Sequence, residues 1–296
     1  MTERQYASTA QVAAALGVSI TTVKRWVDEG VLRAERTVGG HRRILVAEVL
    51  RVARAGDSPL LDLGRLGLPR RGESSAEPKE LAAQLLAALK QGDGSQARLL
   101  VQGYRNGLTV ADLADSVVSP VMAQIGHQWQ EGSLDVLHEH RASQACAAAL
   151  YALKSDLEQS VKTGMPVAVG GGPEGDPYLL ANLLVESVLL DAGWQAINFG
   201  PHTPIASFRK ALKEFRPRLL WLSISHLESP DDFSREYRDL YRDAEHSGTA
   251  VALGGRALTE EVRTGLPYTT YGDRMSHLSA FAHSLHPVTR RPPRKK

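Results

Sequence analysis

The sequence lacks the features that mark secreted and membrane proteins. It contains one cysteine, Cys146, among 296 residues, so no disulfide can form within the chain. No uninterrupted apolar run approaches the roughly 20 residues that span a bilayer. The opening MTERQYASTAQ has no apolar stretch behind its charges, so we expect no signal peptide. These absences predict a protein of the reducing cytoplasm with no membrane partner.

The chain also has little excess charge, because 35 Lys and Arg nearly balance 33 Asp and Glu. The distribution of that charge is uneven. Residues 1–56 carry nine basic against five acidic side chains, a balance of +4, and the tail at 287–296 adds five basic residues and no acid. Basic segments of this kind favour a nucleic-acid partner.

Changes in composition predict a multidomain protein of the α and α/β classes. We expect a DNA-binding domain at 1–56, followed by a linker at 57–78 that is dense in Gly, Pro, Ser and charge. Residues 79–162 have apolar side chains at helical spacing, which predicts a cap domain built as a bundle of four or five helices. Residues 165–286 alternate short apolar strands with amphipathic helices, which predicts a doubly wound parallel sheet of the Rossmann-like type. A basic tail at 287–296 ends the chain.

The stretch STAQVAAALGVSITTVKRWVDEGVL has the spacing of a helix-turn-helix. Ser8 and Ser19 are suited to cap two helices, and Gly17 permits the tight turn between them. The exposed side chains of the second helix suit base edges and phosphates; they are Thr21, Thr22, Lys24 and Arg25.

The following stretch, RAERTVGGHRRI, predicts a wing made of two strands. Gly39 and Gly40 form its turn, and His41, Arg42 and Arg43 are expected to leave the turn on one side, where they would contact the phosphate backbone. Helix, turn, wing and basic balance together predict binding to double-stranded DNA. The alternative is a plain packing unit whose charges are only solvated.

Residues 8–54 resemble the winged-helix domain of MerR-type regulators that carry a GGHRR wing. Four fragments, GGGPEGDPYLL, NFGPHTP, LSIS and ALGGRAL, resemble loops of the cobalamin-binding fold. In combination, the chain resembles the CarH/LitR light-dependent repressors over almost its whole length. That resemblance implies a transcriptional repressor that binds operator DNA, takes adenosylcobalamin as its cofactor and switches between oligomeric states on a light or ligand signal.

The stretch WQEGSLDVLHEH, residues 129–140, is open to three interpretations from its residues alone: a solvated helix end, a metal site or one wall of a pocket. Adjacent residues of a helix point in different directions, which disfavours a metal site at 138–140. In the CarH/LitR family, a Trp, nine further residues and then Glu-His face the adenosyl group. The resemblance therefore implies that Trp129, Glu139 and His140 form a lid over the ligand.

The loops after the predicted strands supply the other expected cofactor contacts. In parallel sheets of this kind, ligands bind outside the carboxyl ends of the strands. A glycine pair lets the backbone approach a bulky ring because no Cβ intervenes. The expected contact residues are Glu174, Asp176, Thr203, Ser223, Ser225, Gly254 and Gly255.

The chain departs from the family where cobalt is bound from below. The family pattern is an acidic residue, any residue, His, two residues and Gly; set against residues 174–179, it leaves Asp176 in place of the cobalt-binding His and Leu179 in place of the Gly. A carboxylate is a poor substitute for imidazole on cobalt. The residue after the lid tryptophan is Gln130, where members that form a protein–cobalt bond after photolysis have His. His202 lies on a neighbouring loop, and the metal ligand stays unassigned.

Three interpretations of the ligand follow: adenosylcobalamin with its own base or a water below the cobalt, another tetrapyrrole, or no ligand and a constitutive oligomerisation module. An enzyme is a further alternative, because corrinoid carriers and mutases share the fold. Such systems need a catalytic partner, commonly a barrel of about 250 residues, and the sequence predicts none. We therefore expect a sensor and not an enzyme. Because one winged helix buries little surface, we expect a dimer or tetramer on DNA.

Overall fold

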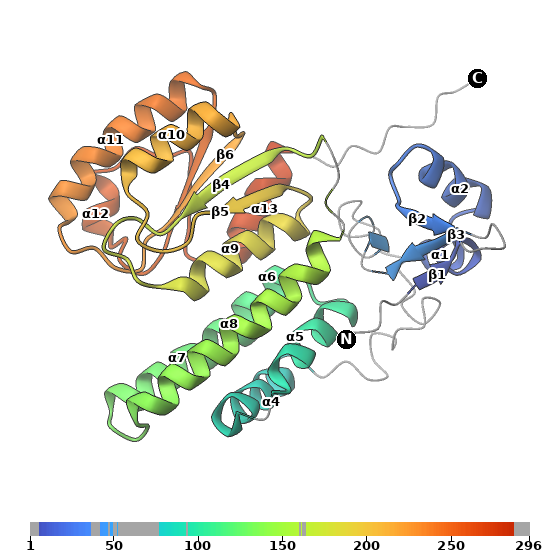
Figure 1. Cartoon of the computed structure of the whole chain (residues 1–296), viewed down its shortest axis with the longest axis horizontal. Coiled ribbons are helices and arrows are strands. Elements are labelled where there is room, and N and C mark those ends of the chain that lie inside the picture. The colour runs from blue at the N-terminus through green and yellow to red at the C-terminus, as the bar shows by residue number, and fades with distance from the viewer. Residues whose placement is uncertain are drawn as a thin grey trace.

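The structure is a computed structural model that describes residues 6–36, 42–46, 48, 49, 52, 77–92, 94–159, 161 and 164–286 (Figure 1). Of the expected linker at 57–78, only residues 77 and 78 lie among them, and the expected tail at 287–296 lies outside. The predicted class is confirmed: an N-terminal helix-turn-helix precedes a helical domain and a parallel-sheet, Rossmann-like domain.

The N-terminal domain has two helices beside a three-stranded antiparallel sheet of order β1-β3-β2. Its elements are β1 (Tyr6–Ser8), α1 (Thr9–Leu16), α2 (Ile20–Asp28), β2 (Ala34–Arg36) and β3 (Arg42–Leu45). As predicted, Ser8 caps α1 in a capping box with Gln11, and Ser19 caps α2. Gly17 ends α1 with a φ of 64°, a left-handed conformation that glycine adopts without strain.

The second domain is a bundle of helices. Its elements are α4 (Pro78–Gln91), α5 (Gln96–Arg105), α6 (Val110–Leu113), the π-helical turn η2 (Ala114–Val118), α7 (Ser119–Gln130) and α8 (Val136–Glu158). Helices α6, η2 and α7 follow one another without a break. Leucine and alanine side chains at helical spacing form a continuous buried core, which also takes in Leu183 and Val188 of the following domain.

The third domain is a five-stranded parallel sheet of order β5-β4-β6-β7-β8. Its strands are β4 (Val167–Gly171), β5 (Gln195–Asn198), β6 (Leu219–Ser223), β7 (Ala250–Gly254) and β8 (Thr270–Gly272). Its helices are α9 (Leu179–Asp191), α10 (Ile205–Phe215), α11 (Pro230–His246), α12 (Glu260–Thr264) and α13 (Met275–Leu285). Strands and helices alternate as the sequence predicts, because short β-branched or leucine runs separate the amphipathic segments.

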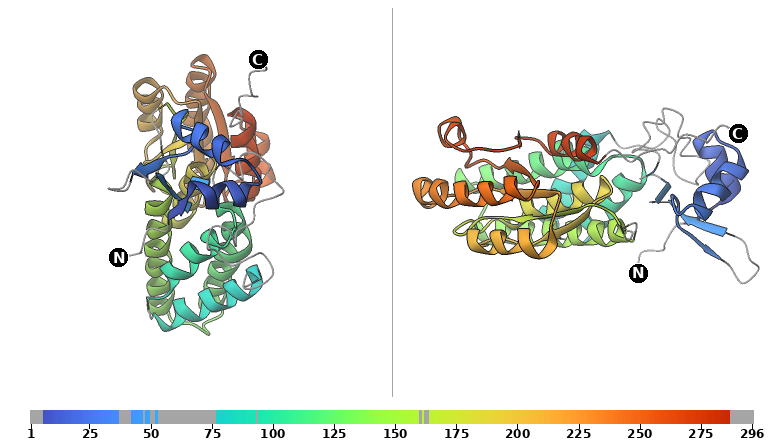
Figure 2. Two further views of the ribbon diagram at one scale, coloured as in Figure 1. Left: turned by 90° about the vertical axis from the view of Figure 1, so that its right-hand side faces the viewer. Right: turned by 90° about the horizontal axis from the view of Figure 1, so that it is seen from above.

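The molecule is layered. Helices α10 and α11 cover one face of the sheet and α9 and α13 the other, and the helical bundle packs against α9 through α8 (Figure 1). The N-terminal domain lies beyond the amino ends of the strands, away from their carboxyl ends (Figure 1 and Figure 2). Arg33 of the N-terminal domain contacts the helical bundle: its Nη1 donates a hydrogen bond to the carbonyl of Gln159, at the end of α8, at 3.3 Å.

Polar side chains tie the helical bundle to the sheet domain. Lys154 Nζ of α8 lies 2.7 Å from Glu186 Oε1 of α9, and Glu186 is 2% exposed. The carboxylate of Asp115 accepts hydrogen bonds from the backbone amides of Met275 and Ser276, at the start of α13. These contacts fix the two domains against each other around the apolar core.

Cys146 is buried in α8 among the apolar side chains of the bundle. Burial raises the pKa of its thiol to about 12. The thiol is therefore protonated at neutral pH and is neither a nucleophile nor a metal ligand.

In the part of the chain that the structure describes, no helix has the length and apolar character needed to cross a bilayer.

Candidate functional site

The carboxyl ends of the parallel strands form one edge, and glycines there let neighbouring loops pack closely against one another. Gly255 has a φ of 115°, and a Cβ at this position would lie 2.2 Å from the carbonyl oxygen of Ile224. A Cβ on Gly254 would lie 2.9 Å from the carbonyl of Gly272. Both glycines are therefore required by the close approach of loops β6–α11 and β7–α12 and of strand β8.

Asp176 lies in this edge, but its carboxylate does not face a ligand. The side chain is fully buried, and its oxygens accept hydrogen bonds from three backbone amides. Oδ1 accepts from Tyr178 at 3.0 Å, while Oδ2 accepts from Ser225 at 2.5 Å and from His226 at 3.2 Å. The backbone carbonyl of Asp176 accepts from the amide of His202 at 3.0 Å. Asp176 thus fastens three loops together.

The expectation that Asp176 occupies the place of the cobalt-binding His is therefore wrong in this structure. A carboxylate committed to three amides has no free oxygen directed at a metal. The family pattern also fits two positions later, with Asp176 as its acidic residue, Tyr178 in place of the His and Ala181 in place of the Gly. The structure favours this register, because Tyr178 is 43% exposed at the start of α9.

Tyr178 has a partner on the neighbouring loop. The guanidinium carbon of Arg256 lies 4.4 Å from the centroid of the Tyr178 ring, a cation–π contact. Arg256 also donates through Nε to the carbonyl of Ser225. Neither Tyr178 nor Arg256 stands out in the sequence as a site candidate. The signal that could have found Tyr178 was the pattern in its other register.

The other expected contact residues of the loops are Thr203, Ser223, Ser225 and Glu174. Thr203 is buried, and its hydroxyl faces the carbonyls of Phe199 and Gly200 at 3.4 Å, so it supports its own loop. Ser223 is 4% exposed and lines a cavity below the edge. Ser225 uses its backbone to hold Asp176 and Arg256. Glu174 is exposed on the β4–α9 loop.

The stretch at 129–140 is the tip of a helical hairpin. Helix α7 ends at Gln130, and Asp135 caps α8 by accepting a hydrogen bond from the amide of Leu137 at 2.9 Å. Figure 1 shows this tip at the same end of the molecule as the β4–α9 loop. The segment therefore projects from the bundle toward the end that carries the sheet's carboxyl edge.

The three expected lid residues lie on this hairpin. Trp129 is 46% exposed, near the end of α7. Glu139 Oε1 accepts from the hydroxyl of Ser143 at 2.8 Å, and its other oxygen lies 3.6 Å from His140 Nε2. The hairpin also exposes Leu137, which is 59% exposed. Trp129 and Leu137 are therefore large apolar side chains that lie in solvent at the tip of the bundle.

Within the described ranges, no three His, Cys, Asp or Glu side chains gather into a group that could hold a metal ion. The edge and the hairpin thus supply apolar, aromatic and backbone contacts and not a set of metal ligands.

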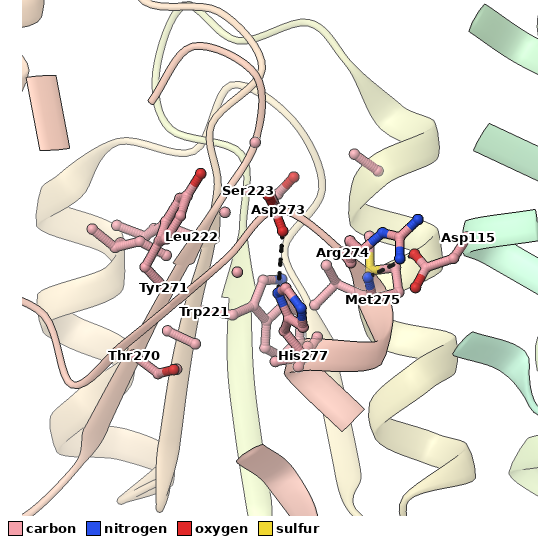
Figure 3. A pocket seen from close by; sticks show the side chains of 18 of the residues that line it. Asp115, Trp221, Leu222, Ser223, Thr270, Tyr271, Asp273, Arg274, Met275 and His277 are labelled. Carbon is pink, nitrogen blue, oxygen red and sulfur yellow. Dashed lines mark hydrogen bonds and ion pairs between the residues drawn. The ribbon is translucent and has the colours of Figure 1, made fainter. Parts of the chain in front are cut away.

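A cavity lies below the edge, between the sheet and helices α9 and α13 (Figure 3). Its volume is about 140 Å³. Its walls come from strands β6, β7 and β8, from α9 and α13, and from η2 and α7 of the helical bundle; they include Asp115, Ser119, Val185, Trp221, Ser223, Ala252, Thr270, Tyr271 and Met275. Because Ser223 and Gly254 end their strands, the cavity lies directly under the candidate ligand surface.

The expected DNA-contact residues of α2 lie on its solvent face. Thr21, Lys24 and Arg25 are exposed. Thr22 is half-buried, and its hydroxyl lies 2.9 Å from Ser19 Oγ, so it also takes part in the cap of α2. Val23 is fully buried, and Trp26 packs partly buried against the same core. The helix therefore presents one polar, basic face.

The wing residues do not leave the turn on one side, as the sequence analysis expected. Successive residues of a strand point to opposite faces, and Arg42 and Arg43 both lie in β3. Arg42 Nη2 pairs with Asp28 Oδ1 of α2 at 2.6 Å, whereas Arg43 is exposed, with its guanidinium 5.3 Å from the Tyr6 ring centroid. His41, Gly39 and Gly40 lie outside the described residues.

Two family models match the chain. A helix-turn-helix domain matches residues 8–57, and a B12 binding domain matches residues 81–154. The chain joins a DNA-binding type of domain to a B12-binding one. The second match covers the helical bundle that carries the hairpin with Trp129, Glu139 and His140.

The curated relatives are of two kinds. Trimethylamine corrinoid protein 1 of Methanosarcina mazei is 25% identical over 148 residues, which are 49% of this chain and 68% of that protein. The HTH-type transcriptional repressor CarH of Myxococcus xanthus is 26% identical over 287 residues, which cover 87% of this chain and 91% of the relative. One kind matches part of the chain, and the other matches most of it.

A solved structure shares the fold of the helical and sheet domains. The monomethylamine corrinoid protein of Methanosarcina barkeri has a TM-score of 0.59 at 17% identity, and the match covers 71% of this chain and 100% of that one. The likeness confirms a cobalamin-binding type of fold. Asp176 does not fit the role of a corrinoid's lower ligand, because its buried carboxylate accepts hydrogen bonds from backbone amides.

Proposed function

We propose that this chain is a DNA-binding transcriptional regulator, acting as a repressor, whose corrinoid-binding module controls its assembly on operator DNA. Adenosylcobalamin is the proposed cofactor, and light or ligand binding is the proposed signal. The observation that carries the proposal is the fusion of a helix-turn-helix domain to a B12-binding domain in one chain. A repressor relative that matches 87% of the chain supports it.

The proposed mechanism follows from the arrangement of the domains. The expected ligand surface lies at the carboxyl edge of the sheet, and the DNA-binding domain lies beyond the opposite ends of the strands (Figure 1). A ligand at that edge cannot touch DNA contacted by α2. It acts only if it favours one assembly state of the helical and sheet domains over another. A homodimer or tetramer then places several DNA-binding domains on repeated half-sites.

A corrinoid carrier of an enzyme system is the second candidate. It is supported by the corrinoid protein of Methanosarcina mazei, which is 25% identical over 49% of this chain. The solved corrinoid protein is covered completely, yet it matches only 71% of this chain. The rest of the chain, which includes a helix-turn-helix match, has no use in carrying a methyl group. That difference favours the regulator.

The test is an absorption spectrum with size-exclusion chromatography. The full chain is mixed with adenosylcobalamin in the dark, desalted and measured before and after green light. We expect a retained corrinoid spectrum that changes on illumination, together with a change in oligomer size. Fluorescence anisotropy with labelled DNA from upstream of its own coding sequence should then show tighter binding by one of the two assemblies. A colourless protein of unchanged size, with equal DNA affinity under both conditions, would reject the proposed switch.

Replacing Arg43 by alanine should weaken DNA binding by a similar factor on every sequence. Arg43 is exposed on β3, so its loss removes one phosphate contact, and the slope of log affinity against log salt should fall by about 1. Anisotropy titrations at several salt concentrations measure both quantities.

Arg242→Ala is the matched control. Arg242 is an exposed arginine of α11 that pairs with Asp239, so the substitution removes the same charge from the sheet domain. It should leave the salt slope unchanged. Equal slopes for the parent and Arg43→Ala would show that the wing assignment is wrong.

A further inference from the structure

The size of the cavity under the carboxyl edge limits the groups that can project from the lower face of a ligand lying on that edge. Its lining includes Ser223, Gly254 and Gly272, which end strands β6, β7 and β8. A group that projects from the ring toward the sheet therefore enters this cavity. Figure 3 shows the strand ends and the first turn of α13 around it.

Trp221 occupies the sheet side of the cavity. It is the third residue of β6, is 2% exposed and lines the cavity together with Ala252 of the neighbouring strand. Its ring lies over β4, because a Cβ built on Gly170 would come within 2.3 Å of Trp221 Cδ2. The neighbouring strand β4 has glycine at this position, and the missing side chain leaves room for the indole. A smaller residue in place of Trp221 would leave a deeper cavity on this face of the sheet.

The indole N–H of Trp221 is buried and has no hydrogen-bond partner among the described atoms. A buried donor without a partner costs stability. The donor belongs to a residue that lines the cavity. An acceptor on a bound group, or a water, would satisfy it.

The remaining space is small. The cavity measures about 140 Å³. A protein cavity of about 150 Å³ holds one benzene molecule. The lower base of cobalamin is a dimethylbenzimidazole, which has two fused rings and two methyl groups. A site of one-ring size does not accept that group without displacing side chains, and overpacking a filled interior is unfavourable.

We infer that Trp221 makes this chain prefer, over cobalamin, corrinoids whose lower appendage is absent or no larger than a single ring. The inference rests on the proposed function, because it assumes that a corrinoid lies on the carboxyl edge. It adds a selectivity against cobalamin's own base. Trp221 acts as a specificity-determining residue for the ligand, through the space that its indole fills.

The test compares three corrinoids in their adenosyl forms, kept in the dark: cobinamide with no base, a cobamide with imidazole as its base, and cobalamin. Equilibrium dialysis against the full chain, read by corrinoid absorbance, gives each dissociation constant. We expect the first two to bind alike and cobalamin to bind at least about tenfold more weakly, the lower end of what overpacking costs. This comparison needs no variant.

Trp221→Val then tests the residue. Valine keeps a strand-forming side chain and opens the cavity, so cobalamin should bind within about threefold of cobinamide. Trp194→Phe is the matched control. Trp194 is fully buried in the same cluster and also lacks a partner for its indole N–H among the described atoms, but it does not line the cavity. This control should keep the parent's order of affinities.

The outcomes separate the two claims. A parent that binds cobalamin as tightly as cobinamide overturns the inference and leaves the proposed function standing. A parent with the expected order, whose Trp221→Val variant folds but keeps that order, overturns the assignment to Trp221. Binding of none of the three corrinoids rejects the proposed ligand class, and the inference falls with it.

Discussion

Asp176→Ala should lower the free energy of unfolding by about 3 kcal/mol, because three buried amides lose a charged acceptor. The carboxylate is fully buried and accepts from the amides of Tyr178, Ser225 and His226. Alanine supplies no oxygen that could accept these hydrogen bonds. Urea unfolding followed by circular dichroism measures the change as a lower midpoint.

Two comparisons make this prediction specific to the anchor. Asp176→Asn keeps one oxygen acceptor and nearly the same shape, so it should lose about half as much stability. Glu174→Ala removes an exposed carboxylate from the same loop and should change stability by no more than about 0.5 kcal/mol. An Asp176→Ala variant as stable as Glu174→Ala would mean that Asp176 does not hold the loops together.

The prediction that Asp176 stands in place of the cobalt-binding His was wrong because a short motif can fit a sequence in more than one register. The stretch EGDPYLLA fits the family pattern in two registers, and the letters alone do not choose between them. Burial chooses. An aspartate that accepts from an amide two residues later forms an Asx-turn, and such a residue is committed to the backbone. Tyr178, two positions later, is the exposed side chain that this second register places at the edge.

The elements of the sheet domain could be predicted from sequence because their periodicities are strong. The run RLLWLSIS is too apolar for a surface segment and too short for a helix, and it forms β6. The hairpin within 129–140 was harder to place. Its Gly-Ser pair was visible, but the apolar spacing on both sides continues the helical pattern, so the break between α7 and α8 depends on the Asp135 cap.

Features that depend on two distant segments could not be predicted. Arg42 looks like a free phosphate contact in sequence, and only the fold brings it to Asp28. Trp221 looks like an ordinary core residue of a buried strand. Its position beside a cavity depends on Gly170 in β4 and Ala252 in β7, which the sheet order places on either side of it. Pair contacts across domains, such as Lys154 with Glu186, have the same origin.

Lys154→Met should destabilise the folded chain by about 3 kcal/mol, because it leaves the carboxylate of Glu186 buried without its cation. Glu186 is 2% exposed, and among the described residues the amide of Asn198, which donates to Oε2 at 3.2 Å, is the one side-chain partner it would keep after the substitution. The pair joins α8 to α9, so its loss should loosen the helical bundle from the sheet domain. Chemical unfolding gives the stability, and hydrogen exchange in α8 and α9 reports the loosening.

The pH dependence follows from the pKa of Lys154. Burial lowers that pKa, but the hydrogen bond and charge of Glu186, with a further contribution from Glu158, outweigh burial and raise it above its ordinary value. A raised lysine pKa means that the pair's contribution is fully present below the unfolded pKa of about 10.4 and is lost as pH rises through the folded pKa. Stability differences between the parent and Lys154→Met should therefore stay constant from pH 6 to about 9.

A double-mutant cycle isolates the pair from the packing of the lysine stem. Glu186→Gln removes the charge but keeps an amide that can accept a hydrogen bond, and the double variant removes both charges. We expect the double variant to be more stable than the sum of the single losses predicts, by more than about 1 kcal/mol, because no buried charge is left alone. Losses that simply add would assign the effect to side-chain packing. The connection between the helical bundle and the sheet would then rest on the apolar core formed by Leu150, Leu153 and Leu184.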